Sequence, residues 1–377
     1  MTPTQGPPAD RAALCVEPVT GLPEVVRGTD LAALLAPALA GRSAPLAVVV
    51  SSKVISKALG LQVPARDKDR AIDGETQRVV AERSTAGRVT RIVEAKAGPV
   101  MAAAGVDASN VGSVPLALLL PHDADSEARR LRQSLLTALD RGDDEPLAVI
   151  VSDTAGRAWR SGVTDFALGC AGLVPLLDHR GEQDADGRAL SVTVRCPADE
   201  IAAAADLVKG KVDGIPAAVV TGLPAAWFAP DAPGARTIVR TGAGDWFALG
   251  HVEAVRSALG VPPGSRSAAR VGIPGTGGLD DLSTRCRRAL ALALDDEQVG
   301  VDVLEDDEST RVTPSGPEYP VGRFVGRLEV AAWAESVTVT VAGDGGLRLS
   351  DAGAAGWAGV SAASSEPHDE ASSHRPR

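Results

Sequence analysis

Two hard-oxygen side chains and two arginines follow a short apolar segment, close enough in sequence to form one site. Residues 147–151 are apolar and rich in β-branched side chains, which predicts a buried strand that stops before Asp153, with a Gly-Arg turn soon after. Asp153 and Thr154 offer the oxygen ligands that Mg²⁺ or Mn²⁺ prefers, and Arg157 and Arg160 could bind phosphate or carboxylate. The ordinary alternative is a turn in which the Asp153 side chain bonds to its own backbone.

Two further segments bring charged groups to predicted strand ends. The apolar run at residues 46–50 ends before Lys53, and Lys57 follows one helical turn later, a pair suited to phosphate unless the lysines only solvate a helix start. Asp107 and Asn110 fall in a tight turn and offer a carboxylate and an amide, although an Asx turn would explain them as well. Ligands of open α/β sheets bind beyond the carboxyl ends of strands, so these groups could converge.

The elements that must position these groups alternate between strand and helix, which predicts an α/β fold in the first two thirds of the chain. Acidic residues Asp123 and Asp125 are expected to cap a helix, and Asp30 or Thr29 another. We predict strands at residues 13–18, 46–50, 89–95, 116–120 and 147–151, and helices at residues 31–39, 65–83, 126–139 and 199–208.

The last third of the chain has a different pattern, typical of a small α+β domain. A helix is predicted at residues 280–294, strands at residues 299–304, 323–332 and 337–341, and a hairpin turn at residues 344–346. The sequence does not reveal the role of this domain, which we place at residues 250–361. Residues 1–11 and 362–377 are polar or proline-rich and are expected to be disordered.

The composition excludes several classes of protein. A chain of 377 residues that is 44% hydrophobic is globular and long enough for two domains. A net charge of −11 and an aromatic content of 3% argue against a nucleic-acid partner. The four cysteines form no CxxC pair, which excludes a zinc-finger type of site and indicates a reducing compartment. Without a bilayer-spanning apolar run or an export signal, we expect a cytoplasmic protein with no membrane partner.

Several longer motifs, in unbroken order between residues 21 and 249, resemble the coenzyme F420:L-glutamate ligases, or F420-0:gamma-glutamyl ligases. The motifs are SSKVISKALG, GVDASNVG, LLPHDADSEARRLR, VIVSDTAGRAWRSGV, a D-x-x-G-x-x-D-x-x-G-R-x-L pattern from Asp178 to Leu190, and ADEIAAAADLVKGKVDGIPAAVV. The resemblance implies the family's own α/β fold with mixed sheets over residues 12–249. It also implies an intertwined homodimer.

The activity implied by the resemblance uses GTP and a divalent metal, Mg²⁺ or Mn²⁺, to join L-glutamate to the deazaflavin precursor F420-0 by an amide bond and then to extend the tail through γ-linkages. Matching positions imply metal ligands at Asp107, Asp153 and Thr154, and catalytic roles for Asp153 and Arg157. They imply GTP contacts at Leu22, Pro23, Glu24, Val25, Ser52, Lys53, Lys57, Asn110, Lys209, Gly210, Lys211, Gly214, Ile215 and Pro216.

Three positions depart from the archaeal pattern of the family. Leu59 replaces a glutamate, Ser161 replaces an arginine, and Lys211 stands where archaeal members have a metal-binding Glu or Gln, although a protonated lysine cannot bind a cation. Two alternatives to the ligase therefore stay open. One is a GTP-binding or F420-precursor-binding regulatory protein of the same fold, and the other is a metal-dependent ligase or phosphoryl-transfer enzyme with a different acyl acceptor.

Overall fold

A computed structural model describes residues 13–85, 88–109, 111, 114–273 and 280–352. The chain divides into two compact units, one made of residues 1–79 and 92–248 and the other of residues 80–91 and 249–377. The predicted disordered ends lie outside the described residues. Among the helices that the structure describes, none has the length and apolar character needed to cross a membrane.

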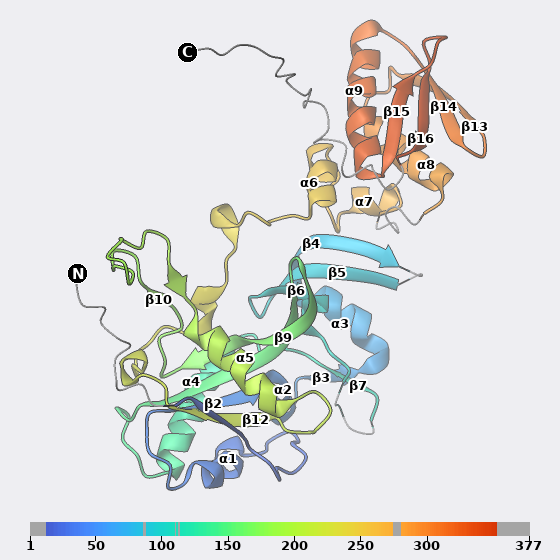
Figure 1. Ribbon diagram of the computed structural model, residues 1–377. Helices are drawn as coiled ribbons and strands as arrows, with labels where there is room; N and C mark the ends of the chain where they lie inside the picture. Colours follow the sequence, from blue (N-terminus) through green and yellow to red (C-terminus); the bar gives the residue numbers. More distant parts are fainter. Residues whose placement is uncertain (1–12, 86–87, 110, 112–113, 274–279, 353–377) are drawn as a thin grey trace, which may run out of the picture. The chain divides into compact units, whose positions relative to one another are not determined.

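The first unit is built on a five-stranded mixed sheet (Figure 1). Its strands, in spatial order, are β1 (Cys15–Pro18), β12 (Ala217–Thr221), β2 (Leu46–Ser51), β8 (Leu147–Arg157) and β9 (Arg160–Ala171). Strands β2 and β8 run parallel, and the other neighbours are antiparallel. The predicted fold class, α/β with mixed sheets, is confirmed.

Helices cover both faces of this sheet. Side chains of β2 alternate between two apolar clusters: Val48 and Val50 pack with α1 (Leu31–Leu39), α2 (Ser52–Leu59) and α4 (Ala124–Ala138). Ala47 and Val49 pack with α5 (Pro197–Lys209) on the other side. Burial on both faces explains why β2 and the first part of β8 read as unbroken apolar runs rather than alternating ones. Each buried valine contributes about 1.5–3 kcal/mol to this packing.

Strand β8 is longer than the sequence predicted. Instead of stopping before Asp153, it passes a bulge between Val151 and Ser152 and continues to Arg157, paired with β9. The alternative of a turn at Asp153 is therefore wrong, and so is the expected turn at Gly156 and Arg157, because the connection to β9 lies at residues 158–159. Polar residues do not end this strand because the neighbouring strand supplies hydrogen-bond partners for its backbone.

Other predictions for the first unit meet mixed outcomes. Asp30 caps α1 and Asp123 caps α4, as expected. Asp125 is not a cap: its buried carboxylate accepts hydrogen bonds from the backbone N–H groups of Cys170, Ala235 and Arg236, at 2.7–3.0 Å. The predicted helix at residues 65–83 is wrong beyond its middle, since β4 begins there. Other elements of this unit are β3 (Gln62–Pro64), α3 (Lys68–Glu75), β6 (Val100–Ala102), β7 (Leu116–Leu118), β10 (Leu177–Asp178) and β11 (Val194–Arg195). Strands β4 (Thr76–Thr85) and β5 (Arg88–Ala95) are each divided between the two units.

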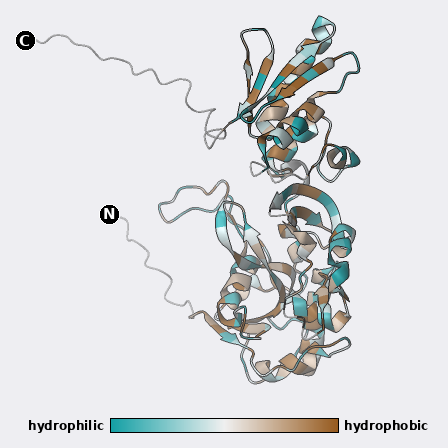
Figure 2. Cartoon of the chain, turned by 90° about the vertical axis from the view of Figure 1, so that its right-hand side faces the viewer, coloured by the Kyte–Doolittle hydropathy of each residue, from teal (hydrophilic) through white to brown (hydrophobic). Residues whose placement is uncertain are grey.

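The second unit has a four-stranded antiparallel sheet packed on helices. Its elements are α6 (His251–Ala258), α7 (Arg266–Arg270), α8 (Leu282–Ala293), β13 (Gly300–Glu305), β14 (Ser309–Ser315), α9 (Glu318–Ala334), β15 (Val337–Val341) and β16 (Leu347–Asp351). The sheet order is β13-β14-β16-β15. Buried and exposed residues alternate along β16, and Figure 2 shows brown and teal segments along the strands of this unit. One face of the sheet is therefore apolar and packs against α8 and α9.

The strand predicted at residues 323–332 is wrong, because this segment lies in α9. Phe324, Leu328 and Ala331 are buried at helical spacing, and they face the apolar cluster of the second unit. Aromatic and β-branched residues within the segment favour a strand locally, and packing of the helical stripe overrides that preference.

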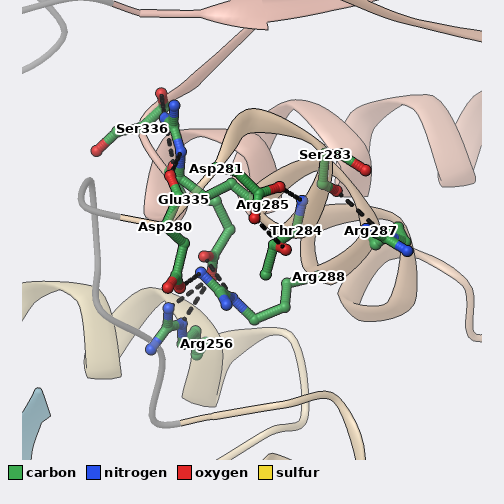
Figure 3. A network of polar contacts seen from close by, with 10 residues as sticks. All are labelled: Arg256, Asp280, Asp281, Ser283, Thr284, Arg285, Arg287, Arg288, Glu335 and Ser336. Carbon is green, nitrogen blue, oxygen red and sulfur yellow. Dashed lines mark hydrogen bonds and ion pairs between the residues drawn. The ribbon is translucent and has the colours of Figure 1, made fainter. Parts of the chain in front are cut away.

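A buried charge network joins three helices of the second unit (Figure 3). Glu335, just after α9, accepts from Arg256 Nε of α6 at 3.1 Å and from Arg288 Nε of α8 at 2.9 Å. Arg288 also pairs with Asp280 at 2.7 Å, and Arg285 donates to the Ser336 carbonyl at 2.7 Å. Such a network holds the helix ends in one arrangement, because each buried charge depends on its partner.

Candidate functional site

A pocket of about 370 Å³ opens in the first unit at the carboxyl end of β2, beside the residues of β8 that follow its parallel pairing with β2. This size lies within the usual range for small-molecule sites. Ser51 and Ser152 are register partners at this edge, so the residues that follow each of them enter the same space. The lining residues are Leu22, Pro23, Glu24, Val25, Ser51, Lys53, Val54, Lys57, Asp153, Thr154, Asp165, Asp206, Lys209, Gly210, Lys211, Gly214, Ile215 and Pro216.

Most of the predicted site residues thus lie around one pocket. Ser52 is not among the lining residues, but its hydroxyl donates to Asp153 Oδ1 at 3.1 Å. Asp107 reaches the site through its contact with Lys53. Arg157 is exposed beyond the pocket near the end of β8, so the structure does not bring this predicted catalytic residue to the others. Asn110 lies outside the described residues.

Lys53 and Asp107 form an ion pair at one side of the pocket. The Lys53 ammonium also donates to Ser109 Oγ at 2.7 Å, and Ser109 donates to Asp107 through its hydroxyl at 2.6 Å and its backbone N–H at 3.0 Å. Burial opposes ionisation of Asp107, but the hydrogen bonds from Lys53 and Ser109 outweigh it and lower the pKa of this carboxyl to about 2. Asp107 is therefore a carboxylate at neutral pH.

Asp153 is a carboxyl group with little compensation for its charge. Burial raises its pKa to about 6, against the smaller opposing effects of hydrogen bonds from the Thr154 backbone and the Ser52 hydroxyl. A positive ion placed beside Asp153 would favour its charged form, because opposite charge within a few ångströms stabilises a carboxylate.

Thr154 points into a second polar network, on the side of the sheet covered by α5. Its hydroxyl donates to Asp165 Oδ1 at 2.8 Å, and Ser152 donates to Asp165 Oδ2 at 2.8 Å. Lys209, at the end of α5, completes the network with a 2.5 Å ion pair to Asp165 Oδ2. Both charged side chains of this pair are only 4% exposed, and both residues line the pocket.

Asp165 and Asp206 also line the pocket, although neither was predicted to be a site residue. Asp165 lies in β9, a strand that was not predicted, and it becomes visible as a site residue only as the register partner of Thr154. Asp206 lies one turn before Lys209 on α5, and burial together with the neighbouring Asp165 raises its pKa. An acidic residue on the last turn of a predicted helix gives no signal by itself.

The segment after α5 forms one rim of the pocket. Gly210 has a φ of +59° and a ψ of −173°, a backbone conformation that residues with a side chain rarely adopt, so the position favours glycine. Lys211 is exposed and its Nζ lies 3.4 Å from Thr154 Oγ1. Lys57, another lining residue, pairs with Glu24 at 2.5 Å. Two lysines therefore line the pocket together with the oxygens of Asp153 and Thr154, within reach of an anionic ligand.

The donor set suits a divalent cation that is shared with a ligand. Within the part of the chain that the structure describes, no three His, Cys, Asp or Glu side chains converge on a complete cation site. Mg²⁺ is usually held by one or two carboxylates together with water and substrate phosphates. Asp153 and Thr154 supply such a partial set, with Asp107 on the far side of Lys53.

Comparison with known proteins matches the same part of the chain. The family described as F420-0:Gamma-glutamyl ligase matches residues 21–222. A coenzyme F420:L-glutamate ligase of Archaeoglobus fulgidus is 40% identical over 223 residues, which cover 55% of this chain and 87% of the relative. Proteins of the same name from Methanothermobacter thermautotrophicus and Halorubrum lacusprofundi are each 37% identical, over 230 and 216 residues; these cover 55% and 52% of this chain and 88% and 82% of the relatives.

Proposed function

Because the chain belongs to the F420-0:gamma-glutamyl ligase family, we propose that it attaches L-glutamate to coenzyme F420-0 with GTP as the energy source. The observation that supports this proposal is the meeting of lysines and hard oxygens in one pocket, on the segments that match the family. An amide cannot form readily from a free carboxylate, so the acyl group needs activation. Transfer of the GTP γ-phosphoryl group to the F420-0 carboxylate would give an acyl phosphate and GDP.

The second half of the reaction is an acyl transfer. The amine of L-glutamate attacks the carbonyl carbon of the acyl phosphate, the C–N bond forms, phosphate leaves with the electrons of the C–O bond, and the amine loses a proton. This sequence requires no nucleophile from the protein. Catalysis then depends mainly on positioning the reactants and on offsetting negative charge, which buried, preorganised groups do well.

The lysines of the pocket are suited to the phosphates of GTP. Lys57 and Lys211 both line the pocket, and the present partner of each is not a buried charge. Each would exchange its present contact for a phosphate oxygen, with which an ammonium group makes a charge-assisted hydrogen bond. Lys53 would remain between Asp107 and the ligand, where its charge offsets that of both.

Mg²⁺ or Mn²⁺ would be held by Asp153 and Thr154, with Asp107 as a third ligand. When bound, the cation would neutralise charge on the phosphate oxygens during transfer. Lys211 lies against the Thr154 oxygen, so it would move toward the phosphates as the cation binds. We propose on this basis that Lys211 contacts phosphate rather than the cation, which accounts for a lysine at a position with Glu or Gln in archaeal members.

The proposal is tested by incubating the purified chain with F420-0, L-glutamate, GTP and Mn²⁺ or Mg²⁺. We expect the product mass to rise by glutamate units and the GDP released to match the amide bonds formed. GTP binding without product would instead support a regulatory protein of the same fold. GDP release that depends on another carboxylic acid would indicate a different acyl acceptor. Omission of the metal and of GTP, each in turn, provides the controls.

A further inference from the structure

Asp165 has no direct role in the reaction proposed above, but one of its three donors is the hydroxyl of Thr154, a proposed cation ligand. Its Oδ1 accepts from the Thr154 hydroxyl at 2.8 Å, and its Oδ2 accepts from Ser152 at 2.8 Å and Lys209 at 2.5 Å. Asp165 is 4% exposed, so these contacts are shielded from water. Its oxygens already serve three protein donors, which leaves it poorly placed to act as a cation ligand itself.

We propose that Asp165 is a positioning residue that orients the Thr154 hydroxyl toward a divalent cation and fixes the rim of the pocket through Lys209. The inference rests on the proposed metal-dependent function. A threonine hydroxyl has one proton and two lone pairs. Because that proton is donated to Asp165, the two lone pairs face away from Asp165, and one of them accepts a hydrogen bond from Lys211 at 3.4 Å.

The second part of this role concerns the pocket rim. Lys209 is the last residue of α5, and the lining segment that includes Gly210 and Lys211 follows it directly. A buried ammonium group needs a nearby carboxylate, since burial of an unpaired charge is strongly unfavourable. The Asp165–Lys209 pair thus fixes the start of the rim to β9, so one carboxylate aligns two walls of the same pocket. Outer partners of metal ligands typically change metal affinity or activity 10- to 100-fold when mutated.

The experiment is a double-mutant cycle on Mn²⁺ binding, measured by electron paramagnetic resonance with GTP present, together with thermal unfolding. We expect Asp165→Asn to raise the Mn²⁺ dissociation constant about 10- to 100-fold. Thr154→Val should weaken Mn²⁺ binding as well. In the Thr154→Val background, Asp165→Asn should cause a smaller loss than in the wild type, because the hydroxyl that Asp165 orients is already gone and only its contact with Lys209 is still affected. Full additivity of the two effects would overturn the proposal, since it would show a charge effect independent of Thr154.

Asp206→Asn is the matched control, because Asp206 also lines the pocket and carries the same charge. Its effect on Mn²⁺ affinity should be clearly smaller than that of Asp165→Asn, and an equal effect would contradict positioning. If Asp165→Asn does not fold, Asp165→Asn/Lys209→Met removes both buried charges, and the same cycle with Thr154→Val is measured in that background. Wild-type Mn²⁺ affinity in a folded Asp165 variant would also overturn the inference.

The two proposals fail in different ways. Absence of glutamate addition by the wild-type chain would contradict the ligase function, whereas the Mn²⁺ cycle would still decide whether Asp165 acts through Thr154. In an active enzyme, we expect Asp165→Asn to raise the Mn²⁺ concentration needed for half-maximal rate more than it lowers the rate at saturating Mn²⁺. A variant that was only less stable would have a lower rate at saturating Mn²⁺, but the Mn²⁺ concentration needed for half-maximal rate would not change.

Discussion

Replacement of Glu335 by glutamine should destabilise the second unit strongly while leaving the pocket of the first unit unchanged. Glu335 is 1% exposed and receives the guanidinium groups of Arg256 and Arg288, which are 4% and 5% exposed. After the substitution, Arg288 keeps its 2.7 Å pair with Asp280, whereas Arg256 loses the carboxylate that compensates its charge. Removal of one partner of a buried ion pair costs about 3–5 kcal/mol.

The lower end of this range applies, because glutamine keeps one acceptor oxygen and one arginine keeps a carboxylate. We therefore expect a loss of about 3 kcal/mol in the free energy of unfolding. With a denaturant slope of about 2 kcal/mol/M, the urea midpoint of the second unit should fall by about 1.5 M. Circular dichroism follows the unfolding, and the data are fitted with two transitions because the chain has two compact units.

Glu329→Gln is the control, since Glu329 is an exposed residue of the same helix, α9. Exposed substitutions of this kind usually change stability by less than about 0.5 kcal/mol. If Glu335→Gln shifted the midpoint no more than Glu329→Gln does, the buried network would not stabilise the unit as argued. GTP binding, measured in parallel, should be equal in both variants.

Three further predictions concern single residues. Asp153→Asn should reduce turnover at least about 100-fold, as expected when a charged group of a phosphoryl-transfer site is removed, with an unchanged circular dichroism spectrum; wild-type rates would exclude Asp153 from the site. Gly210→Ala should raise the KM for GTP, because a residue with a side chain is strained at φ +59° and would shift the pocket rim; an unchanged KM would show that the rim tolerates the substitution. Asp281 caps α8, and hydrogen bonds from Thr284 hold its pKa below the usual value, so its stabilising effect is present above about pH 4 and is lost as pH falls through the lowered pKa. The stability difference between wild type and Asp281→Ala should therefore shrink in acid, and a difference that is constant from pH 7 to pH 2 would contradict this cause.

The sequence was informative where local pattern and global packing agree. The apolar runs of β2 and β8 are buried on both faces, so they are recognisable without knowledge of their neighbours. Lys53 and Asp153 follow these runs, and the parallel pairing of the strands brings them to one pocket. The location of this pocket could therefore be predicted from two strand ends.

Features that depend on distant pairing could not be predicted in this way. The extension of β8 beyond Val151 depends on β9, and without that partner a Ser-Asp-Thr sequence favours a turn. Asp165 becomes part of the site through the same pairing. In the second unit, the segment that contains Phe324 favours a strand by composition. Its helical state depends on packing in an apolar cluster to which α7, α8, β14, β15 and β16 also contribute.

The strand order of the five-stranded sheet also has a consequence for the synthesis of the chain. β12 lies between β1 and β2 in the sheet, although in the sequence it comes long after both of them, near the end of the first unit. During synthesis, β1 and β2 cannot form their backbone hydrogen bonds with β12 until Thr221 has left the ribosome. We expect slow, late consolidation of this unit, since long-range strand pairing carries a large loop-closure cost. The nascent chain would expose unpaired apolar strand edges during this interval, so we expect chaperones to reduce its aggregation.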